Sequence, residues 1–420
     1  MEHGKSWYKL DNVAKLFPSS ARGGDTRVFR LMCELNEPVD ERTLQEALDA
    51  VIADFPHLKC VLRKGLFWYY LDYRDIRAIV SNENLNACSA LYYGGRKNLL
   101  FRVNFFGNRI NLEMFHVLAD GTGAFIFFKA LITKYLSLRH NFLITDAVTE
   151  TASAYGMGSD AFDRFYEPKK FKRKAKKERI RNAYHIKGTT DDNLLPHLVE
   201  GTMSVKSFID IAHKYNTTVG ILATSVYIAA VIDEMTLQEQ SRPIVVSVPV
   251  NLRNYFKSET ARNFFGVIRV TYDARNYDGE LSTIIKAVKQ SFDFQLSKDR
   301  IAQTMNNYSA LEHNLAIKMV PLWIKDFSMG RYNRLIARGV TSTMSNLGTV
   351  GMPEPASSYI VKFGAFMTAP FEQVSIVSFK DRMVIGEVSS FVNHEVMLHF
   401  YRRLTELGLS VEIATNDNDN

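Results

Sequence analysis

The sequence is poor in cysteine and lacks long hydrophobic runs. Only three of its 420 residues are cysteines, and Cys33, Cys60 and Cys88 form no CxxC pair. An odd and sparse set of this kind argues against a disulfide framework and favours a reducing compartment. The longest apolar run, 220–232, is far shorter than the ~20 residues that a bilayer requires. The N-terminal residues show no apolar signal-peptide core. We therefore expect a cytoplasmic protein with no integral membrane segment.

Several motifs of nucleotide and hydrolase chemistry are also missing. The sequence contains no GxSxG, no P-loop and no GxGxxG, so a hydrolase, an NTPase or a dinucleotide-binding protein has no motif in its favour. A metal site would need a second histidine or a cluster of carboxylates. His394 and His399 are five residues apart and do not share a helix face. We expect no metal.

Positive charge is concentrated in one segment. The net charge of the chain is +7, but residues 169–187 hold ten Lys/Arg and one Glu, a net +9, which leaves 7 − 9 = −2 for the rest. Few aromatic residues interleave these charges, as stacking on single-stranded nucleic acid would require. We interpret the segment as a solvated linker. An anionic partner, such as a nucleotide phosphate or an acidic carrier protein, is the alternative, and nucleic-acid binding through the linker is a remote one.

The length and composition predict two cores of mixed α/β structure. At 420 residues and 46% hydrophobic composition, the chain is long enough for two cores of ~200 residues each. Strand and helix patterns occur on both sides of the basic segment, with helical patterns late in the chain around 281–296 and through 300–325. We expect a first half at 1–165, a basic linker at 166–190 and a second half at 191–420.

One stretch changes its periodicity around an HxxxDG motif, formed by His116, Asp120 and Gly121. Residues 109–116 alternate apolar and polar, which predicts a strand whose buried face ends in His116. From 122 onward apolar residues recur at spacings of three and four, which predicts a helix packed on a core. Gly121 and Gly123 would let the backbone turn tightly between the two. The alternative is a core histidine followed by an aspartate that only caps the helix.

Several segments, in the right order, resemble one superfamily. The segments are FRLMCELNEPVDERTLQEALDAVIADFPHLKCVLRKG at 29–65, EMFHVLADGTGA at 113–124, TTVGILATSVYIAAVI at 217–232, VSVPVNLRNYF at 246–256, ARNFFG at 261–266 and TMSNLG at 343–348. Together they resemble the CoA-dependent acyltransferases, which include chloramphenicol acetyltransferase, peptide-synthetase condensation domains and wax-ester synthases. The bacterial alcohol acetyltransferase-like branch is the most similar. Phe115 stands where many members have a first histidine, and TMSNLG resembles the strand that crosses between the halves.

The resemblance implies a fold, a reaction and its co-substrates. The fold would be two similar α/β halves that meet in a V, with a tunnel between them and His116 at its middle. An acyl-CoA, or an acyl-phosphopantetheine on an acidic acyl carrier protein, would enter from one side and a small hydroxyl or amine acceptor from the other. A thioester is already activated, so a neutral imidazole that takes the acceptor's proton is sufficient, without a covalent intermediate. His116 would be this general base.

The resemblance also implies roles for other site residues. Asp120 would pair with an arginine from the second half, and Arg253, just after the predicted strand at 244–250, is the candidate. Ser345, Asn346 and Asn263 are the candidate donors to the oxyanion. Each of these could instead be a turn residue that satisfies its own backbone. A non-catalytic, condensation-like domain that recruits a carrier protein is the alternative function.

Overall fold

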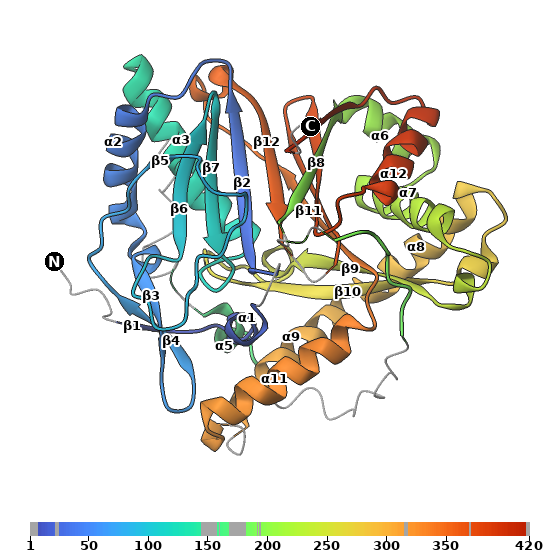
Figure 1. Cartoon of the computed structure of the whole chain (residues 1–420), viewed down its shortest axis with the longest axis horizontal. Coiled ribbons are helices and arrows are strands. Elements are labelled where there is room, and N and C mark those ends of the chain that lie inside the picture. Colours follow the sequence, from blue (N-terminus) through green and yellow to red (C-terminus); the bar gives the residue numbers. More distant parts are fainter. Residues whose placement is uncertain are drawn as a thin grey trace.

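Two lobes, each a sheet with helices against one face, make up most of the structure, which is a computed structural model (Figure 1). It describes residues 7–21, 25–143, 158, 160–167, 182–190, 192, 195–314, 318–368 and 371–416. Most of the predicted basic linker, 168–181, lies outside these residues. Its described end packs on the second lobe, where Ala183 and Tyr184 are buried rather than solvated.

The first lobe is a five-stranded sheet with the order β12–β2–β7–β6–β5. Its elements are β2 (Val28–Leu35), α2 (Glu41–Val51), β5 (Ser81–Asn82), β6 (Phe101–Phe106), β7 (Arg109–Phe115), α3 (Gly121–His140) and, from late in the chain, β12 (Ile360–Met367). Helices α2 and α3 lie side by side against this sheet (Figure 1). Asp40 caps α2, and its carboxylate accepts a hydrogen bond from the Thr43 backbone at 2.8 Å.

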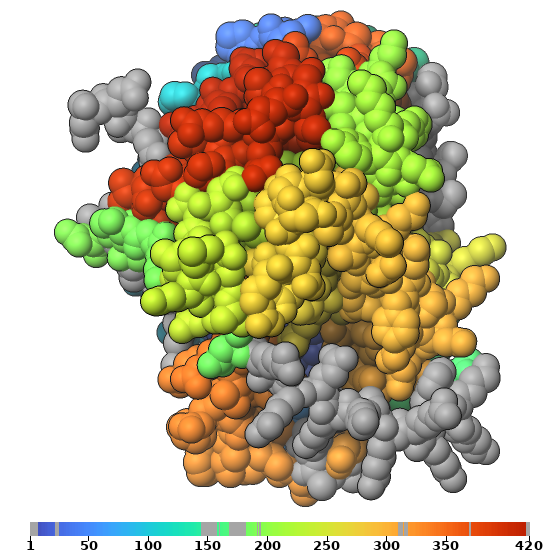
Figure 2. Space-filling model, turned by 90° about the vertical axis from the view of Figure 1, so that its right-hand side faces the viewer, coloured from blue at the N-terminus to red at the C-terminus, as the bar shows by residue number. Residues whose placement is uncertain are grey.

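The second lobe is a seven-stranded sheet with the order β10–β9–β11–β13–β14–β8–β15. Its strands are β8 (His197–Ser204), β9 (Ile244–Asn251), β10 (Phe265–Tyr272), β11 (Ser342–Thr349), β13 (Gln373–Phe379), β14 (Arg382–Ser389) and β15 (Glu412–Thr415). Its helices are α6 (Val205–Lys214), α7 (Val219–Glu234), α8 (Leu281–Gln295) and α12 (Glu395–Glu406). Figure 2 looks onto this helical layer from outside. Strand β11 runs parallel to both of its neighbours, so the sheet is mixed.

Smaller elements lie below the two lobes (Figure 1). They are a three-stranded sheet of β1 (Trp7–Lys9), β4 (Tyr69–Tyr73) and β3 (Cys60–Lys64), the short helices α1 (Phe17–Ser20) and α5 (Ala161–Arg164), and the longer helices α9 (Lys298–His313) and α11 (Leu322–Ala337). The helical pattern predicted through 325 therefore ends too early, because α11 continues to Ala337. The mixed α/β class and the two-lobed architecture are confirmed.

The strand that crosses between the lobes is not the predicted one. Strand β11, which contains the TMSNLG sequence, stays inside the second sheet between β9 and β13. Strand β12 crosses instead and pairs antiparallel with β2 in the first sheet, with Met367 opposite Phe29 at one end. The sequence of β11 alternates little and holds polar residues, so its pattern did not reveal which sheet it joins.

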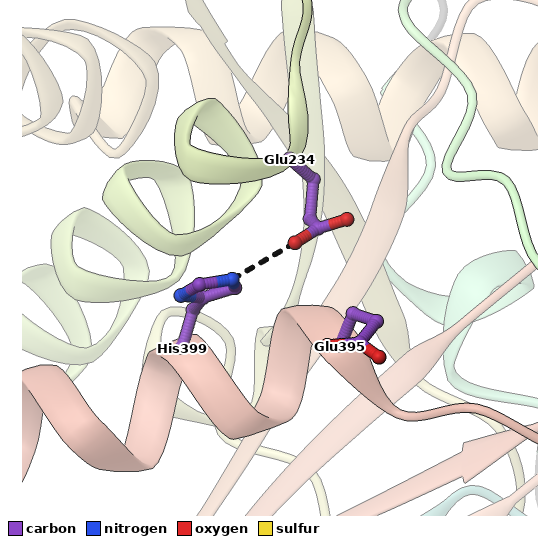
Figure 3. A group of neighbouring side chains, drawn as sticks. All are labelled: Glu234, Glu395 and His399. Carbon is purple, nitrogen blue, oxygen red and sulfur yellow. Dashed lines mark ion pairs between the residues drawn. The ribbon is translucent and has the colours of Figure 1, made fainter.

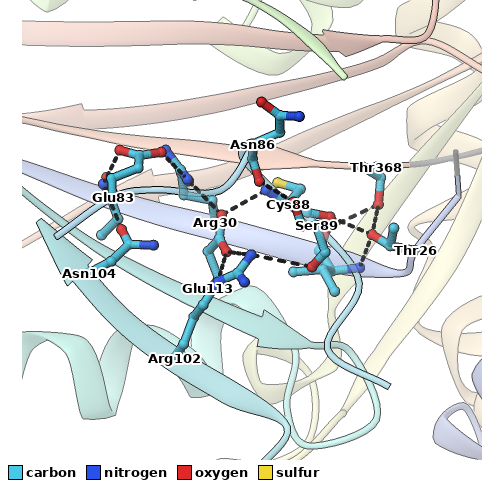
Figure 4. A network of polar contacts seen from close by, with 12 residues as sticks. Thr26, Arg30, Glu83, Asn86, Cys88, Ser89, Arg102, Asn104, Glu113 and Thr368 are labelled. Atoms are coloured by element: carbon cyan, nitrogen blue, oxygen red, sulfur yellow. Dashed lines mark hydrogen bonds and ion pairs between the residues drawn. The ribbon is translucent and has the colours of Figure 1, made fainter. Parts of the chain in front are cut away.

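The face of the first sheet that is turned away from α2 and α3 carries a buried charged network (Figure 4). At its centre the fully buried Glu113 accepts hydrogen bonds from Arg30 Nε at 2.9 Å and from the Cys88 backbone at 2.7 Å. Arg102 pairs with its other carboxylate oxygen, and Arg30 also pairs with Glu83. This network fixes the segment around Cys88 over the sheet.

In the described part of the chain, no single helix is both long and apolar enough to cross a bilayer. The consecutive helices α6 and α7 reach that length and composition only as a pair, and they are bent by 81° where they join.

Candidate active site

The HxxxDG motif lies where β7 leads into α3. Residues on one face of β7 are fully buried, including Leu112 and Met114, which is why the strand delivers the next residue on that face, His116, into the interior. The chain then turns through three buried residues to Asp120, whose extended backbone (φ −84°, ψ 173°) starts the helix at Gly121. The carboxylate of Asp120 caps α3 by accepting the Gly123 N–H at 2.8 Å.

Asp120 also binds the second lobe. Its Oδ2 accepts hydrogen bonds from Arg253 Nη1 at 2.9 Å and from the Phe264 backbone at 2.8 Å. Arg253 lies in the turn after β9, and its guanidinium also donates to the carbonyls of Thr260 at 3.0 Å and Arg262 at 2.6 Å. The predicted pair is therefore formed, and it belongs to a clamp that holds the 260–264 loop against the start of α3.

Gly123 is required by this close approach rather than by a left-handed turn, whereas Gly121 faces the end of a flexible side chain. A Cβ at Gly123 would lie 1.9 Å from the carbonyl oxygen of Ala261 in the clamped loop. A Cβ at Gly121 would lie 2.6 Å from a methyl carbon of Leu347 on β11. Neither glycine has a positive φ. Gly121 and Gly123 therefore let two segments of the second lobe touch the first turn of α3.

His116 is held by an asparagine from that same loop. The ring is 8% exposed and lies among the rings of Phe17, Phe29 and Phe265, at centroid distances of 4.6, 5.2 and 5.6 Å. Its Nδ1 is 2.9 Å from the Oδ1 of Asn263. In the described part of the chain, its Nε2 has no hydrogen-bond partner.

The surroundings of Asn263 determine which nitrogen of His116 carries the proton. Asn263 Nδ2 faces two acceptors, the His116 carbonyl at 3.0 Å and Asp11 Oδ2 at 3.1 Å. The amide nitrogen therefore belongs on that side, and its oxygen faces the ring. An oxygen can only accept, so Nδ1 carries the hydrogen and Nε2 keeps its lone pair. Burial lowers the pKa of His116 against the opposing charge of Asp120, so the ring is neutral near pH 7.

Behind Asn263 lies a buried ion pair that the sequence analysis missed. Asp11, between β1 and α1, is fully buried and lies 3.5 Å from Arg262 Nη2. Burial raises the pKa of Asp11 to about 6, and the charge of Arg262 opposes the shift. Arg262 also donates to the Lys9 carbonyl at 2.6 Å. Asp11 is 105 positions from His116, and no motif connects them, so the sequence carries no signal for this contact.

The three predicted oxyanion donors are placed differently from one another. Asn263 has its amide N–H groups directed at the His116 carbonyl and at Asp11, as described above. Asn346 is exposed and accepts a hydrogen bond from the Gly348 backbone at 2.9 Å, as a turn residue does. Ser345 is half-buried on β11, two residues from the Leu347 side chain that touches Gly121. In the described residues, neither Ser345 nor Asn346 is hydrogen-bonded to His116 or Asp120.

One group of potential metal ligands lies apart from the motif, on the outside of the second lobe. Glu234 at the end of α7 and Glu395 and His399 on α12 place ligand atoms within 4.8 Å of one another (Figure 3). His399 Nε2 is 2.9 Å from Glu234 Oε1. This contact between the two helices is sufficient to explain why the side chains are close.

Comparisons with known proteins identify the fold. No family model and no curated protein sequence matches the chain. Among solved structures, it is similar to TRI3 trichothecene 15-O-acetyltransferase from Fusarium sporotrichioides, at 10% identity over 97% of this chain and 96% of that one, with a TM-score of 0.63. It is similar to F. sporotrichioides TRI101 complexed with coenzyme A and T-2, at 10% identity over 97% and 100%, with a TM-score of 0.67.

A third similar structure is the first condensation domain of the calcium-dependent antibiotic synthetase, at 13% identity over 96% of both chains, with a TM-score of 0.61. The chain therefore has the two-lobed fold of these acetyltransferases and of this condensation domain, which is the fold that the sequence resemblance implies. The whole described architecture takes part, because each match covers nearly all of both chains.

Proposed function

We propose that the protein is an acyltransferase that moves an acyl group from a CoA thioester, or from a carrier-bound phosphopantetheine thioester, to a hydroxyl or amine. The observation that carries this proposal is the state of His116. A neutral imidazole is buried at the lobe interface with Nδ1–H engaged by Asn263 and Nε2 without a partner in the described structure. That is the state in which a histidine can accept a proton from an attacking group.

The reaction follows from this geometry in two steps. Nε2 takes the proton of the acceptor hydroxyl or amine as its oxygen or nitrogen attacks the thioester carbonyl, and His116 becomes an imidazolium. The tetrahedral intermediate then breaks its carbon–sulfur bond, and the imidazolium returns the proton to the leaving thiolate. The products are the ester or amide and the free thiol. No group on the enzyme is acylated, since a thioester needs no further activation.

The other residues of the site would act by holding this geometry. Asn263 fixes the tautomer of His116 and has no N–H left for an oxyanion, so it is a positioning residue in this proposal. Asp120 and Arg253 join the lobes around the reacting ring. The hydroxyl of the half-buried Ser345 is the remaining candidate for stabilising the oxyanion. Donor and acceptor would reach Nε2 along the interface between the lobes.

The test is release of free thiol from acetyl-CoA and longer acyl-CoAs with a panel of alcohols and amines. Wild type is compared with His116→Ala and with His213→Ala, which removes an exposed histidine of α6. We expect release that requires an acceptor, is lost in His116→Ala by a factor of about 10²–10⁴ and is unchanged in His213→Ala. All three proteins should show folded circular dichroism spectra.

Two other outcomes have defined meanings. Release only from acyl-phosphopantetheine on a carrier protein would keep the transferase and identify its donor. No release from either donor would refute the proposal and favour a non-catalytic domain of the same fold, whereas full activity in His116→Ala would refute His116 as the general base.

A further inference from the structure

Helix α11 exposes an unusual set of side chains. Trp323 is 72% and Phe327 66% exposed, and Ile324, Tyr332 and Leu335 are exposed with them. At 100° per residue these five positions fall within one arc of about 180°, and the buried Leu322 and Lys325 lie outside it. Exposed apolar residues are ordinary when they are scattered, but a continuous set of this size on one helix marks an interaction site.

The apolar surface extends onto the hairpin beside α11. Leu66, at the turn between β3 and β4, is 74% exposed, and its carbonyl accepts a hydrogen bond from the Leu322 backbone at 2.9 Å. Lys325 Nζ donates to the Phe67 carbonyl at 3.0 Å and lies over the Trp68 ring. These contacts hold the hairpin against the start of the helix. We call Leu66 together with the exposed arc of α11 the α11 face.

The charges on this face are of one sign. Arg331, Arg334 and Arg338 are exposed on the same side as the apolar residues. The one carboxylate of the helix, Asp326, turns inward and accepts a hydrogen bond from Tyr69 at 2.9 Å. Among the side chains of α11, which the structure describes in full, the charged groups on the exposed arc are therefore all cationic, and Ser328 is exposed among the apolar residues. Figure 1 shows the helix at the lower edge of the molecule, where a flat surface could approach it.

We propose that the α11 face binds the surface of an anionic lipid bilayer. Aromatic and aliphatic side chains with adjacent arginines are the pattern of helices that lie in a membrane interface, where Trp and Tyr sit at the headgroups. Arginine stems can lie along the apolar surface while their guanidinium groups reach lipid phosphates. A second copy fits less well, because a two-fold contact would bring the arginines of both copies together. A nucleic acid could contact the arginines but would offer no apolar partner to Ile324 and Leu335.

The experiment measures flotation of the full-length protein with vesicles of phosphatidylcholine, with or without phosphatidylglycerol. We expect binding to the phosphatidylglycerol vesicles that weakens with added salt. Trp323→Ser with Phe327→Ser should reduce binding at least about tenfold. Phe106→Ser with Leu237→Ser removes side chains that are 66% and 87% exposed elsewhere and should leave binding unchanged. Arg331→Gln with Arg334→Gln should weaken binding to anionic vesicles, and Arg275→Gln on the second lobe should not.

A second readout places the helix in the bilayer. The chain has three tryptophans, so Trp7→Phe with Trp68→Phe leaves Trp323 as the only tryptophan. Its emission should shift to the blue with anionic vesicles and become accessible to quenchers on the acyl chains. No binding by wild type, equal binding by the Trp323→Ser/Phe327→Ser protein, or a dimer that this double variant dissolves would each overturn the proposal. The outcome is independent of thiol release, so the two proposals fail separately.

Discussion

Strand β7 carries two ionisable groups with opposite surroundings, three residues apart. Glu113 faces a polar network that donates to both of its carboxylate oxygens from two arginines and a backbone amide. His116, at the end of the other face, is bonded through Nδ1 alone and keeps Nε2 without a partner in the described structure. A group whose hydrogen-bonding capacity is filled stabilises the fold, whereas a buried group with one open position can carry out chemistry. Burial alone does not distinguish the two.

Replacing Glu113 or His116 by glutamine tests this comparison directly, and these two substitutions should give the largest effects. Glu113→Gln removes the carboxylate that Arg30 and Arg102 share and leaves the buried Arg30 with Glu83 as its remaining partner, so it should lower the free energy of unfolding by about 3 kcal/mol. His116→Gln should lower it by no more than about 1–2 kcal/mol and yet abolish thiol release. Urea unfolding and the release assay measure the two losses. Equal destabilisation by both substitutions would remove the distinction.

Asp120 tests whether a carboxylate of the motif whose two oxygens both accept hydrogen bonds contributes to stability. Asp120→Ala leaves the buried Arg253 and two backbone N–H groups without their acceptor, so we expect a loss of about 3 kcal/mol in stability together with a loss of activity. Asp40→Ala removes a comparable N-cap from α2 that has no partner in the other lobe, and it should cost about 1 kcal/mol. Thermal melting compares the two. A normally melting Asp120→Ala protein would show that the clamp does not hold the lobes.

Substitutions of Asn263 test the hydrogen bond that holds His116 at Nδ1. Asn263→Ala removes the acceptor at Nδ1, so the proton is no longer confined there and kcat should fall about tenfold with KM little changed. Asn263→Asp keeps an acceptor and adds a negative charge, which should raise the pKa of His116 and move the acidic limb of the pH–rate profile to higher pH. A purely structural role would change stability without moving that limb.

Asp11 gives an effect on stability that appears only when the pH changes. Its pKa in the folded protein, about 6, lies above the ordinary value of 3.8. The folded state therefore binds this proton more tightly, and the resulting stability is fully present below about pH 4 and lost as the pH rises through about 6. Over that window wild type should lose up to about 3 kcal/mol relative to Asp11→Asn, which does not titrate. Melting of both proteins across the window measures it, and parallel curves would contradict the shift.

Local patterns in the sequence predicted the elements that carry the site. The alternation before His116 and the helical spacing after Asp120 lie in consecutive residues, so β7, α3 and their junction could be predicted almost to the residue. The partner of Asp120 came from the resemblance to a superfamily. Helix α11 was predicted poorly because its apolar residues lie on both sides, which hides the period of 3.6 residues.

Contacts between distant segments could not be predicted in this way. Asn263 was expected as an oxyanion donor, and only the positions of the Asp11 carboxylate and the His116 carbonyl show that its amide is occupied. The tight spacing at Gly123 has the same origin, because the carbonyl that forbids a side chain there belongs to Ala261. Such requirements arise when two lobes meet, and neither lobe's local sequence records them.

Strand β12 comes late in the chain but belongs to the first sheet, and this affects the order in which the chain can fold. During synthesis β2 emerges early, but the strand that covers one of its edges ends at Met367. Until most of the chain has left the ribosome, that edge presents unpaired backbone N–H and C=O groups, which are a template for pairing with other chains. Fragments that stop at the basic segment would keep this open edge permanently. A first half made alone would therefore lack one strand of its own sheet.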